Sequence, residues 1–167
     1  MRTVVLVRHA KSSWTHPELD DFDRPLNDRG KRDAPEMADR LIKKGIPIDL
    51  LVSSPARRAR KTAFYFAEAY GKTKADVQMV PELYHAHAEQ IIEVIRGLPD
   101  TCSSAVIFGH NPGITEVANS LSHVKIDHFP TCAMYAIRSE VSSWRALPLF
   151  DNEFLFFDYP RAVNVSD

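Results

Sequence analysis

This chain has little cysteine, little glycine and no excess of charge of either sign. Its two cysteines, Cys102 and Cys132, form none of the spacings that are typical of metal ligands. The formal net charge of the 167 residues is −1 at pH 7, which argues against a general affinity for nucleic acid or another polyanion. Any attraction for a phosphate group must therefore come from a few arginines placed at one point.

Long apolar runs are absent too. No stretch approaches the length of a membrane span, and the first apolar run, residues 3–7, is too short for the core of a signal peptide. We therefore expect a cytoplasmic protein with no membrane contact and with both thiols reduced. The length and a hydrophobic share of 44% suit one folded domain, which we expect to span residues 1–167.

Strand and helix signals alternate along the chain, which predicts an α/β architecture. The runs at residues 3–7 and 104–108 are almost wholly apolar, as in parallel strands that are buried on both faces. We expect a three-layer α/β/α sandwich with a mostly parallel central sheet. Pro35 interrupts the first predicted helix, and we expect it to be tolerated only in a first turn, where no amide hydrogen is needed. Candidate strands are residues 3–7, 48–52, 77–80, 104–108, 134–137, 143–148 and 154–159, and candidate helices are residues 31–44, 56–70, 89–96 and 114–121.

Three strand-to-helix junctions carry the polar residues of greatest interest. The first is Arg8 and His9, the second is the basic segment 54–63, and the third is Gly109 and His110. Because parallel strands share one carboxyl edge, where open α/β sheets bind their ligands, we expect the three junctions to meet there. Each junction alone would suit an ordinary turn or a solvated helix face, so the prediction rests on their combination.

Arginine and histidine together suit a phosphoryl group. An arginine holds two phosphate oxygens with its planar fork and stays charged at any relevant pH. A neutral histidine can attack phosphorus and form a covalent phosphoenzyme, and a second histidine can donate hydrogen bonds to the phosphoryl oxygens. Nearby cations would keep the nucleophile neutral, because like charges lower the pKa of an imidazole.

The motifs at these junctions resemble those of the histidine phosphatase superfamily, which includes the phosphoglycerate mutases. The family's Arg-His-Gly signature is matched here by residues 8–10 (RHA). Its Ser-Pro-x-x-Arg-Ala-x-x-Thr-Ala pattern is matched by residues 54–63 (SPARRARKTA), and its Gly-His pair by residues 109–110. Within the family, residues 11–14 and 23–30 are most similar to the small SixA-type phosphohistidine phosphatases.

The resemblance implies a role for each matching residue. His9 would be the nucleophile that becomes phosphohistidine, and Arg8 and Arg58 would bind the phosphoryl oxygens. His110 would complete the pocket and stabilise the transition state. We expect neither a metal ion nor a cofactor in this pocket.

Three further residues are candidates for the site. Ser12 and Asn111 stand beside the two histidine motifs and are candidate contacts for phosphate or substrate. The family's general acid is usually a Glu or Asp shortly after the third strand, or an Asp beside the second histidine. Asn111 cannot act as an acid, so Glu82 remains, with a surface or structural carboxylate as the alternative. Without a firm acid, the chemistry favours a substrate whose leaving group needs little help, such as the imidazole of phosphohistidine.

Two polar groups near these motifs have simpler interpretations. The acidic segment 20–23 is interpreted as a solvated loop whose Phe22 packs inward, because it lacks the length and the central glycine of a calcium loop. His85 and His87 are interpreted either as residues at the rim of the pocket or as solvent-exposed residues. Neither group is expected to hold a metal ion.

Together these observations predict a metal-independent phosphatase that acts through a phosphohistidine intermediate, on phosphohistidine in a protein or on another activated phosphate. One alternative is a phosphatase or mutase of small phosphomonoesters, although a mutase needs a lid that keeps water from its phosphoenzyme, and no segment suits that role. Another alternative is an inactive module that binds phosphate or phosphohistidine, but such a module has no need of a nucleophile. The expected partner is a phosphorylated protein or a small phosphorylated substrate, rather than a nucleic acid or a membrane.

Overall fold

A six-stranded sheet forms the centre of the computed structural model, which describes residues 1–160. The strands have the spatial order β3-β2-β4-β1-β5-β6. The four strands from β3 to β1 are parallel, and β5 runs antiparallel to both of its neighbours, so the sheet is mostly parallel as expected. The bounds are β1 (Arg2–Arg8), β2 (Leu50–Ser53), β3 (Val77–Met79), β4 (Ser104–Gly109), β5 (Met134–Ser139) and β6 (Glu153–Asp158).

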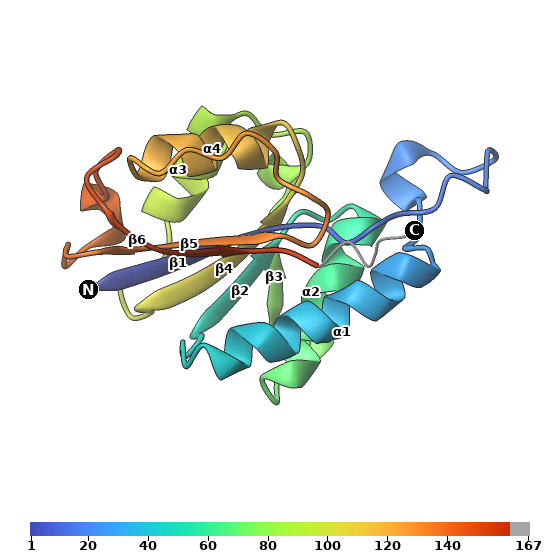
Figure 1. Ribbon diagram of the computed structural model, residues 1–167, viewed down its shortest axis with the longest axis horizontal. Coiled ribbons are helices and arrows are strands. Elements are labelled where there is room, and N and C mark those ends of the chain that lie inside the picture. Colours follow the sequence, from blue (N-terminus) through green and yellow to red (C-terminus); the bar gives the residue numbers. More distant parts are fainter. Residues whose placement is uncertain (161–167) are drawn as a thin grey trace.

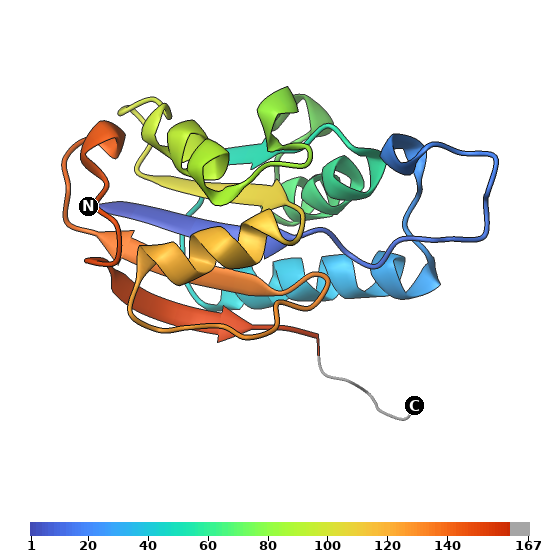
Figure 2. The same ribbon diagram turned by 90° about the horizontal axis from the view of Figure 1, so that it is seen from above.

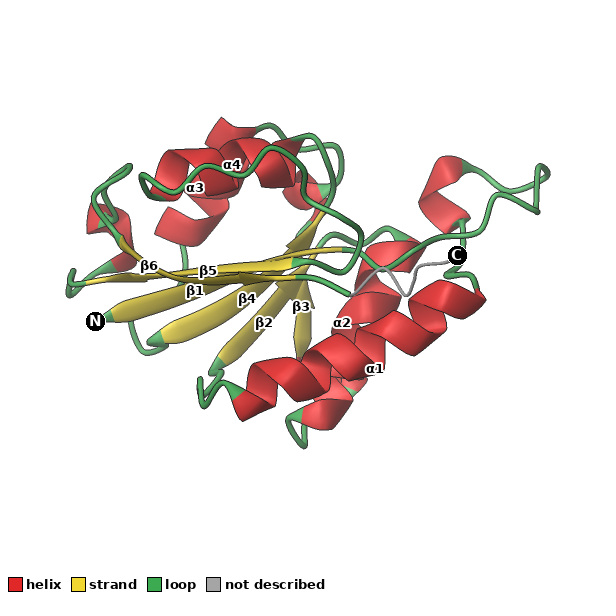
Figure 3. Ribbon diagram, in the orientation of Figure 1, coloured by secondary structure: helices red, strands yellow, loops and turns green. Residues whose placement is uncertain are grey.

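Helices cover both faces of this sheet, which confirms the expected three-layer sandwich (Figures 1 and 3). The helices α1 (Asp28–Lys43) and α2 (Arg57–Ala69) lie on one face, and α3 (Ala88–Arg96) and α4 (Gly113–Leu121) lie on the other. Short 3₁₀ turns complete the chain: η1 (Asp21–Asp23), η2 (Lys74–Asp76), η3 (Pro81–Leu83) and η4 (Trp144–Ala146). Within residues 1–160, none of the helices combines the length and the apolar character needed to cross a bilayer.

The strand β1 shows why the core has two halves. Its side chains alternate between the faces of the sheet, as the geometry of a strand requires. Val4 and Leu6 pack into the core beneath α3 and α4, whereas Val5 and Val7 pack into the core beneath α1 and α2. All four are fully buried, which explains the continuous apolar sequence of this strand.

The expected strand at residues 143–148 is wrong, because this segment contains the 3₁₀ turn η4 instead. Trp144 is fully buried in the core beneath α3 and α4. Its backbone N–H donates to Asp100 Oδ1 at 2.9 Å, and its indole N–H donates to the carbonyl of Cys102 at 2.8 Å. These bonds hold the backbone to a loop rather than to the edge of the sheet.

The expectation for Pro35 is also wrong. The helix α1 begins at Asp28 and is capped by Asn27, so Pro35 lies beyond its first turn. A proline in a helix interior typically costs about 3 kcal/mol, because it removes one hydrogen bond. Pro35 is exposed, however, while Met37 and Leu41 on the other side of α1 are fully buried. Burial of this apolar stripe offsets the loss.

Candidate active site

The register of the sheet aligns the ends of β1, β2 and β4, so the three polar junctions lie beside one another. Arg8, the last residue of β1, pairs with Gly109 at the end of β4. The N–H of His9 donates to the carbonyl of Gly109 at 3.1 Å, and the N–H of Ser54 donates to the carbonyl of Phe108 at 3.0 Å. The residues that follow β1, β2 and β4 therefore lie side by side at the carboxyl edge of the sheet, as predicted.

A cavity of about 200 Å³ opens at this edge. Six of the seven predicted site residues line it, the exception being Glu82. Larger hollows of about 380 and 550 Å³ lie against α2 and α3, but neither contains His9 or His110. The side chains that line the cavity are Arg8, His9, Lys11, Ser12, Trp14, Arg24, Arg58, His85, His110, Asn111 and Thr131.

His9 has the environment that a nucleophilic imidazole needs. Its ring is buried, and Nδ1 lies 2.7 Å from the carbonyl of Ala10. Because a carbonyl can only accept, Nδ1 carries the hydrogen and Nε2 keeps a free lone pair. Burial, joined by the charges of His110, Arg58 and Arg8, lowers the pKa of His9 well below its ordinary value. The ring is therefore neutral at physiological pH.

His110 stands against His9, with the two ring centroids 5.2 Å apart. Burial, with the charges of Arg58 and His85, lowers the pKa of His110 to about 3. Its Nε2 forms a hydrogen bond with Ser54 Oγ at 2.8 Å, whereas Nδ1 is buried with no partner among the described residues. His110 is thus a second neutral imidazole in the cavity, and its Nδ1 forms no hydrogen bond within the described residues.

Two arginines of the cavity also have an unused nitrogen. Arg8 Nε and Arg58 Nε are buried and, like His110 Nδ1, have no hydrogen-bond partner within residues 1–160. Buried polar atoms without partners are uncommon, and a catalytic role or a bound ion is among their explanations. The two guanidinium groups are close enough for the charge of Arg58 to lower the pKa of Arg8, after the effect of burial. This combination suits a tetrahedral anion.

A carboxylate that the sequence analysis missed holds the arginines in place. Asp21 Oδ2 accepts from Arg58 Nη2 at 3.0 Å and from the hydroxyl of Tyr84 at 2.6 Å, and Oδ1 accepts from Arg24 Nε at 3.2 Å. Partial burial works to raise the pKa of Asp21, but the bond from Tyr84 and the charge of Arg58 outweigh it and hold this pKa well below its usual range. Asp21 is exposed, as the interpretation of residues 20–23 as a solvated loop expects, but that interpretation did not include its bonds to the two arginines.

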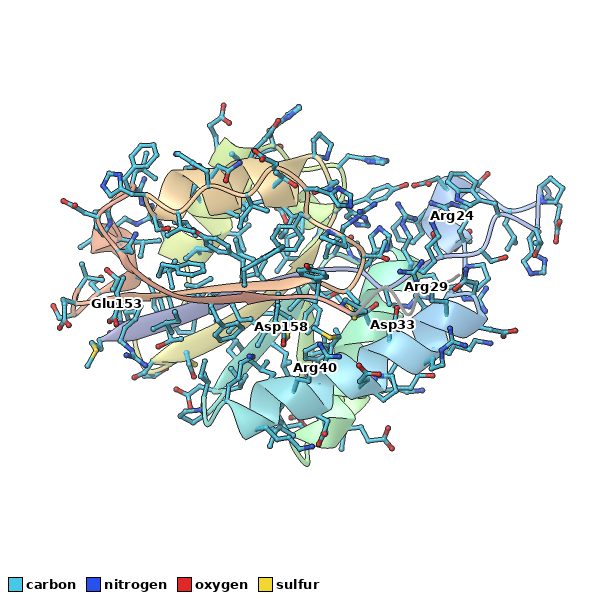
Figure 4. All side chains as sticks on the ribbon, viewed as in Figure 1. Arg24, Arg29, Asp33, Arg40, Glu153 and Asp158 are labelled. Carbon is cyan, nitrogen blue, oxygen red and sulfur yellow. The ribbon has the colours of Figure 1, made fainter. Side chains whose placement is uncertain are left out.

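Arg24 is the second residue that the sequence analysis missed. It lies in the connection between β1 and α1, which extends beyond the carboxyl edge of the sheet (Figures 2 and 4). Its side chain is buried, and Nη1 donates to Ser12 Oγ at 2.6 Å. Ser12 therefore lines the cavity as predicted, but its hydroxyl holds Arg24. The signal that could have indicated Arg24 is its place in the segment 23–30, which resembles SixA-type proteins.

Asn111 and His85 also line the cavity. Asn111 Oδ1 accepts from the hydroxyl of Thr115 at 2.6 Å, and its Nδ2 donates to the carbonyl of Phe129 at 3.2 Å. Both ends of this amide are thus held by the protein. His85 has a positive φ of 58° and stacks on Tyr84, with centroids 3.9 Å apart. His85 agrees with both of its interpretations, because it lines the cavity and is also exposed to solvent.

Glu82 lies outside the cavity that holds His9. It is exposed in the turn η3 and lines the 550 Å³ hollow beside α3. Its role as a general acid remains a prediction that its position does not support. Within the described residues 1–160, no group of three or more His, Cys, Asp or Glu side chains is arranged so that it could hold a metal ion.

Comparison with known proteins agrees with this geometry. The family model of the histidine phosphatase superfamily (branch 1) matches residues 4–91. An uncharacterized chloroplastic protein of Arabidopsis thaliana is 34% identical over 153 residues, which cover 86% of this chain and 69% of the relative. A 2,3-bisphosphoglycerate-dependent phosphoglycerate mutase of Staphylococcus carnosus is 37% identical over 70 residues, which cover 41% of this chain and 31% of the mutase.

A solved structure is similar over nearly the whole length of the chain. It is that of the putative phosphohistidine phosphatase SixA from Agrobacterium tumefaciens, with a TM-score of 0.79 and 27% sequence identity. The alignment covers 95% of this chain and 98% of the SixA chain. The likeness therefore extends well beyond residues 4–91, which match the family model.

Proposed function

This chain belongs to the histidine phosphatase superfamily (branch 1), and we propose that it is a metal-independent phosphatase whose covalent intermediate forms on His9. Membership of the superfamily makes it an enzyme that hydrolyses phosphate esters. The observation that carries the proposal is the arrangement of His9 Nε2, with its free lone pair, among three buried nitrogen atoms that have no partner within residues 1–160. These nitrogens belong to Arg8, Arg58 and His110.

In the first step, Arg8, Arg58 and His110 hold the phosphoryl oxygens while Nε2 of His9 attacks phosphorus. A P–N bond to His9 forms as the bond between phosphorus and the leaving atom breaks. The electron pair of the broken bond stays with the leaving atom, which takes a proton from water. The imidazole needs no prior deprotonation, because it is already neutral.

In the second step, a water molecule attacks the phosphorus on His9 from the side opposite Nε2. The P–Nε2 bond breaks, and its electron pair returns to the imidazole. The proton lost by the water passes to solvent, and inorganic phosphate leaves. The cations that held the substrate oxygens stabilise the same developing charge in both steps, so one cavity serves both.

The residues around the cavity support an activated phosphate as the substrate. Among the described residues, the side chains that line the cavity include no carboxylate. Asp21 lies near, but it is ionised and engaged by Arg58, Arg24 and Tyr84, so it has no proton to give. A leaving group that departs with little help, such as the imidazole of a phosphohistidine side chain, suits such a site. We therefore propose phosphohistidine in a protein as the preferred substrate.

The test compares purified wild-type protein with His9→Ala on three substrates: a phosphohistidine protein, a sugar phosphate and an aryl phosphate. We expect the highest kcat/KM on phosphohistidine, no effect of a chelator such as EDTA, and a loss of at least about a thousandfold in the variant. Circular dichroism of the variant checks that it still folds. Turnover retained in His9→Ala would exclude this residue as the nucleophile, and a chelator-sensitive activity would contradict the metal-independent mechanism.

A further inference from the structure

The rim of the cavity carries an unusually exposed tryptophan. Trp14 is 73% exposed, whereas the other tryptophan of the chain, Trp144, is fully buried. Trp14 lines the same cavity as His9. A single exposed apolar side chain is ordinary on a protein surface. What Trp14 does therefore depends on whether its ring is held in place.

Arg24 holds the ring of Trp14 from one side. The centre of the guanidinium group lies 3.6 Å from the centroid of the indole, which is a close cation–π contact. Arg24 itself has little freedom: it is 8% exposed, and it donates to Ser12 Oγ, to the carbonyl of Ser13 and to the carboxylate of Asp21. The indole thus rests on a fixed surface.

The backbone that leads into Trp14 is fixed as well. The N–H of Ser13 donates to the carbonyl of Pro25 at 2.8 Å, and the N–H of Asn27 donates to the carbonyl of Lys11 at 3.0 Å. These bonds join the segment before Trp14 to the segment that leads into α1. A ring held in this way loses little conformational freedom when a ligand stacks on it.

Asp21 connects this ring to the predicted phosphate site. Its Oδ1 accepts from Arg24, which supports Trp14, and its Oδ2 accepts from Arg58, which is predicted to bind phosphate. One carboxylate therefore orients both arginines. The ring of Trp14 and the phosphate site keep a constant relation to each other, and a group bonded to phosphorus would meet the rim at a defined place.

We propose that the exposed face of Trp14 is the docking surface for the imidazole ring of the substrate phosphohistidine. The inference rests on the function proposed above, since it names the group that Trp14 would contact while phosphorus lies beside His9. A planar aromatic ring stacks on an indole with a gain that corresponds to about a three- to tenfold change in affinity. Trp14 is thus a specificity residue for the leaving group.

Two substrates with the same scissile P–N bond test this proposal. A phosphohistidine peptide carries the imidazole ring, and phosphoramidate does not. In Trp14→Ala, we expect the ratio of kcat/KM for the peptide to that for phosphoramidate to fall about three- to tenfold, mainly through KM of the peptide. Trp14→Phe, which keeps an aromatic ring, should restore most of the ratio. The matched control is Phe150→Ala, because Phe150 is an exposed aromatic outside the cavity lining.

The outcomes separate the two proposals. The docking role of Trp14 is refuted if wild-type protein cleaves the peptide and Trp14→Ala lowers kcat/KM equally for both substrates. It is also refuted if the variant lowers kcat/KM for neither substrate. If wild-type protein cleaves phosphoramidate or aryl phosphate but leaves phosphohistidine intact, the proposed substrate is refuted instead.

Fluorescence gives a second measurement that a merely structural role would not change. In a His9→Ala background, which cannot turn the peptide over, emission that acrylamide quenches comes from exposed Trp14 rather than from buried Trp144. We expect the phosphohistidine peptide to protect this emission from acrylamide and phosphoramidate to leave it accessible. Equal quenching with and without the peptide, at a concentration that saturates binding, would contradict the stacking.

Discussion

At the scale of single residues, the protonation of His9 and His110 determines what the cavity can do. Both rings are buried beside Arg58, and both pKa values lie below the ordinary value for histidine, that of His110 at about 3. A neutral His9 is ready to attack phosphorus, and a neutral His110 has one ring nitrogen free for a phosphoryl oxygen. Because burial keeps both rings neutral, it also makes the free energy of unfolding depend on pH.

The free energy of unfolding should fall as pH is lowered from 7 toward 4. Below pH 6.5 the unfolded chain binds protons on both histidines, whereas burial opposes their protonation in the folded chain, so acid favours unfolding. Each histidine contributes a slope of up to about 1.4 kcal/mol per pH unit below pH 6.5. Urea titrations at several pH values measure this slope.

The matched variants for this titration are His110→Gln and His128→Asn. Replacement of buried His110 should make the dependence on pH shallower, and His128→Asn, at an exposed position, is the control for the loss of a histidine. A free energy of unfolding that stays constant or rises between pH 7 and pH 4 would show that the two buried rings are protonated in the folded protein.

The residues of the cavity differ in how well the sequence could predict them. Arg8, His9 and His110 stand directly after apolar strands, so the shared edge of a parallel sheet predicts that they meet. Asp21 and Arg24 lie in an irregular connection, where neither periodicity nor spacing relates one side chain to another. Only the folded structure shows that Asp21 joins Arg24 to Arg58.

At the scale of elements, most strands and helices follow from the alternation of apolar runs and helical periodicity. The segment 143–148 is the exception, because the burial of Trp144 and its bonds to the loop at Asp100 outweigh its strand-like pattern. Sequence pattern also does not show how tightly two elements approach. The start of α4 is such a place, since Gly113 lies against the backbone of Ala86.

Gly113→Ala should destabilise the protein and disturb the cavity. A Cβ at Gly113 would lie 2.0 Å from the carbonyl oxygen of Ala86, and this backbone cannot yield as a flexible side chain would. We expect a loss of about 1–3 kcal/mol in stability, and a lower kcat/KM because His85, which precedes Ala86, lines the cavity.

The control is Gly109→Ala. Its Cβ would meet Ile114 Cδ1 at 3.5 Å, which is an ordinary contact, so the loss should be smaller than that of Gly113→Ala. Urea denaturation and turnover of an aryl phosphate measure both effects. Equal stability of the two variants would mean that the segment around Ala86 adapts to the added carbon.

At the scale of the whole molecule, one sheet connects the two halves of the core. The strand β1 contributes Val4 and Leu6 to one half and Val5 and Val7 to the other. At the edge of the sheet, Arg40 of α1 also forms an ion pair with Asp158 of β6 at 3.2 Å (Figure 4). Neither half is complete without the shared strands, which supports the proposal of a single domain.

A single domain should unfold in one cooperative transition. Fluorescence of buried Trp144, followed in a Trp14→Phe background, reports the half of the core beneath α3 and α4. Far-ultraviolet circular dichroism reports the helices of both layers. We expect the two urea midpoints to coincide, and separate midpoints would indicate that the layers unfold independently.

The most direct test of the central claim is to trap the phosphoryl group on the protein. Wild-type protein is mixed with radiolabelled phosphohistidine substrate, quenched within milliseconds in alkali, which preserves phosphohistidine, and digested for mass spectrometry. We predict label on the peptide that contains His9, approaching one phosphoryl group per chain when water attack is the slower step, and none in His9→Ala. Label on another residue, or turnover with no labelled intermediate at any quench time, would contradict the proposed mechanism.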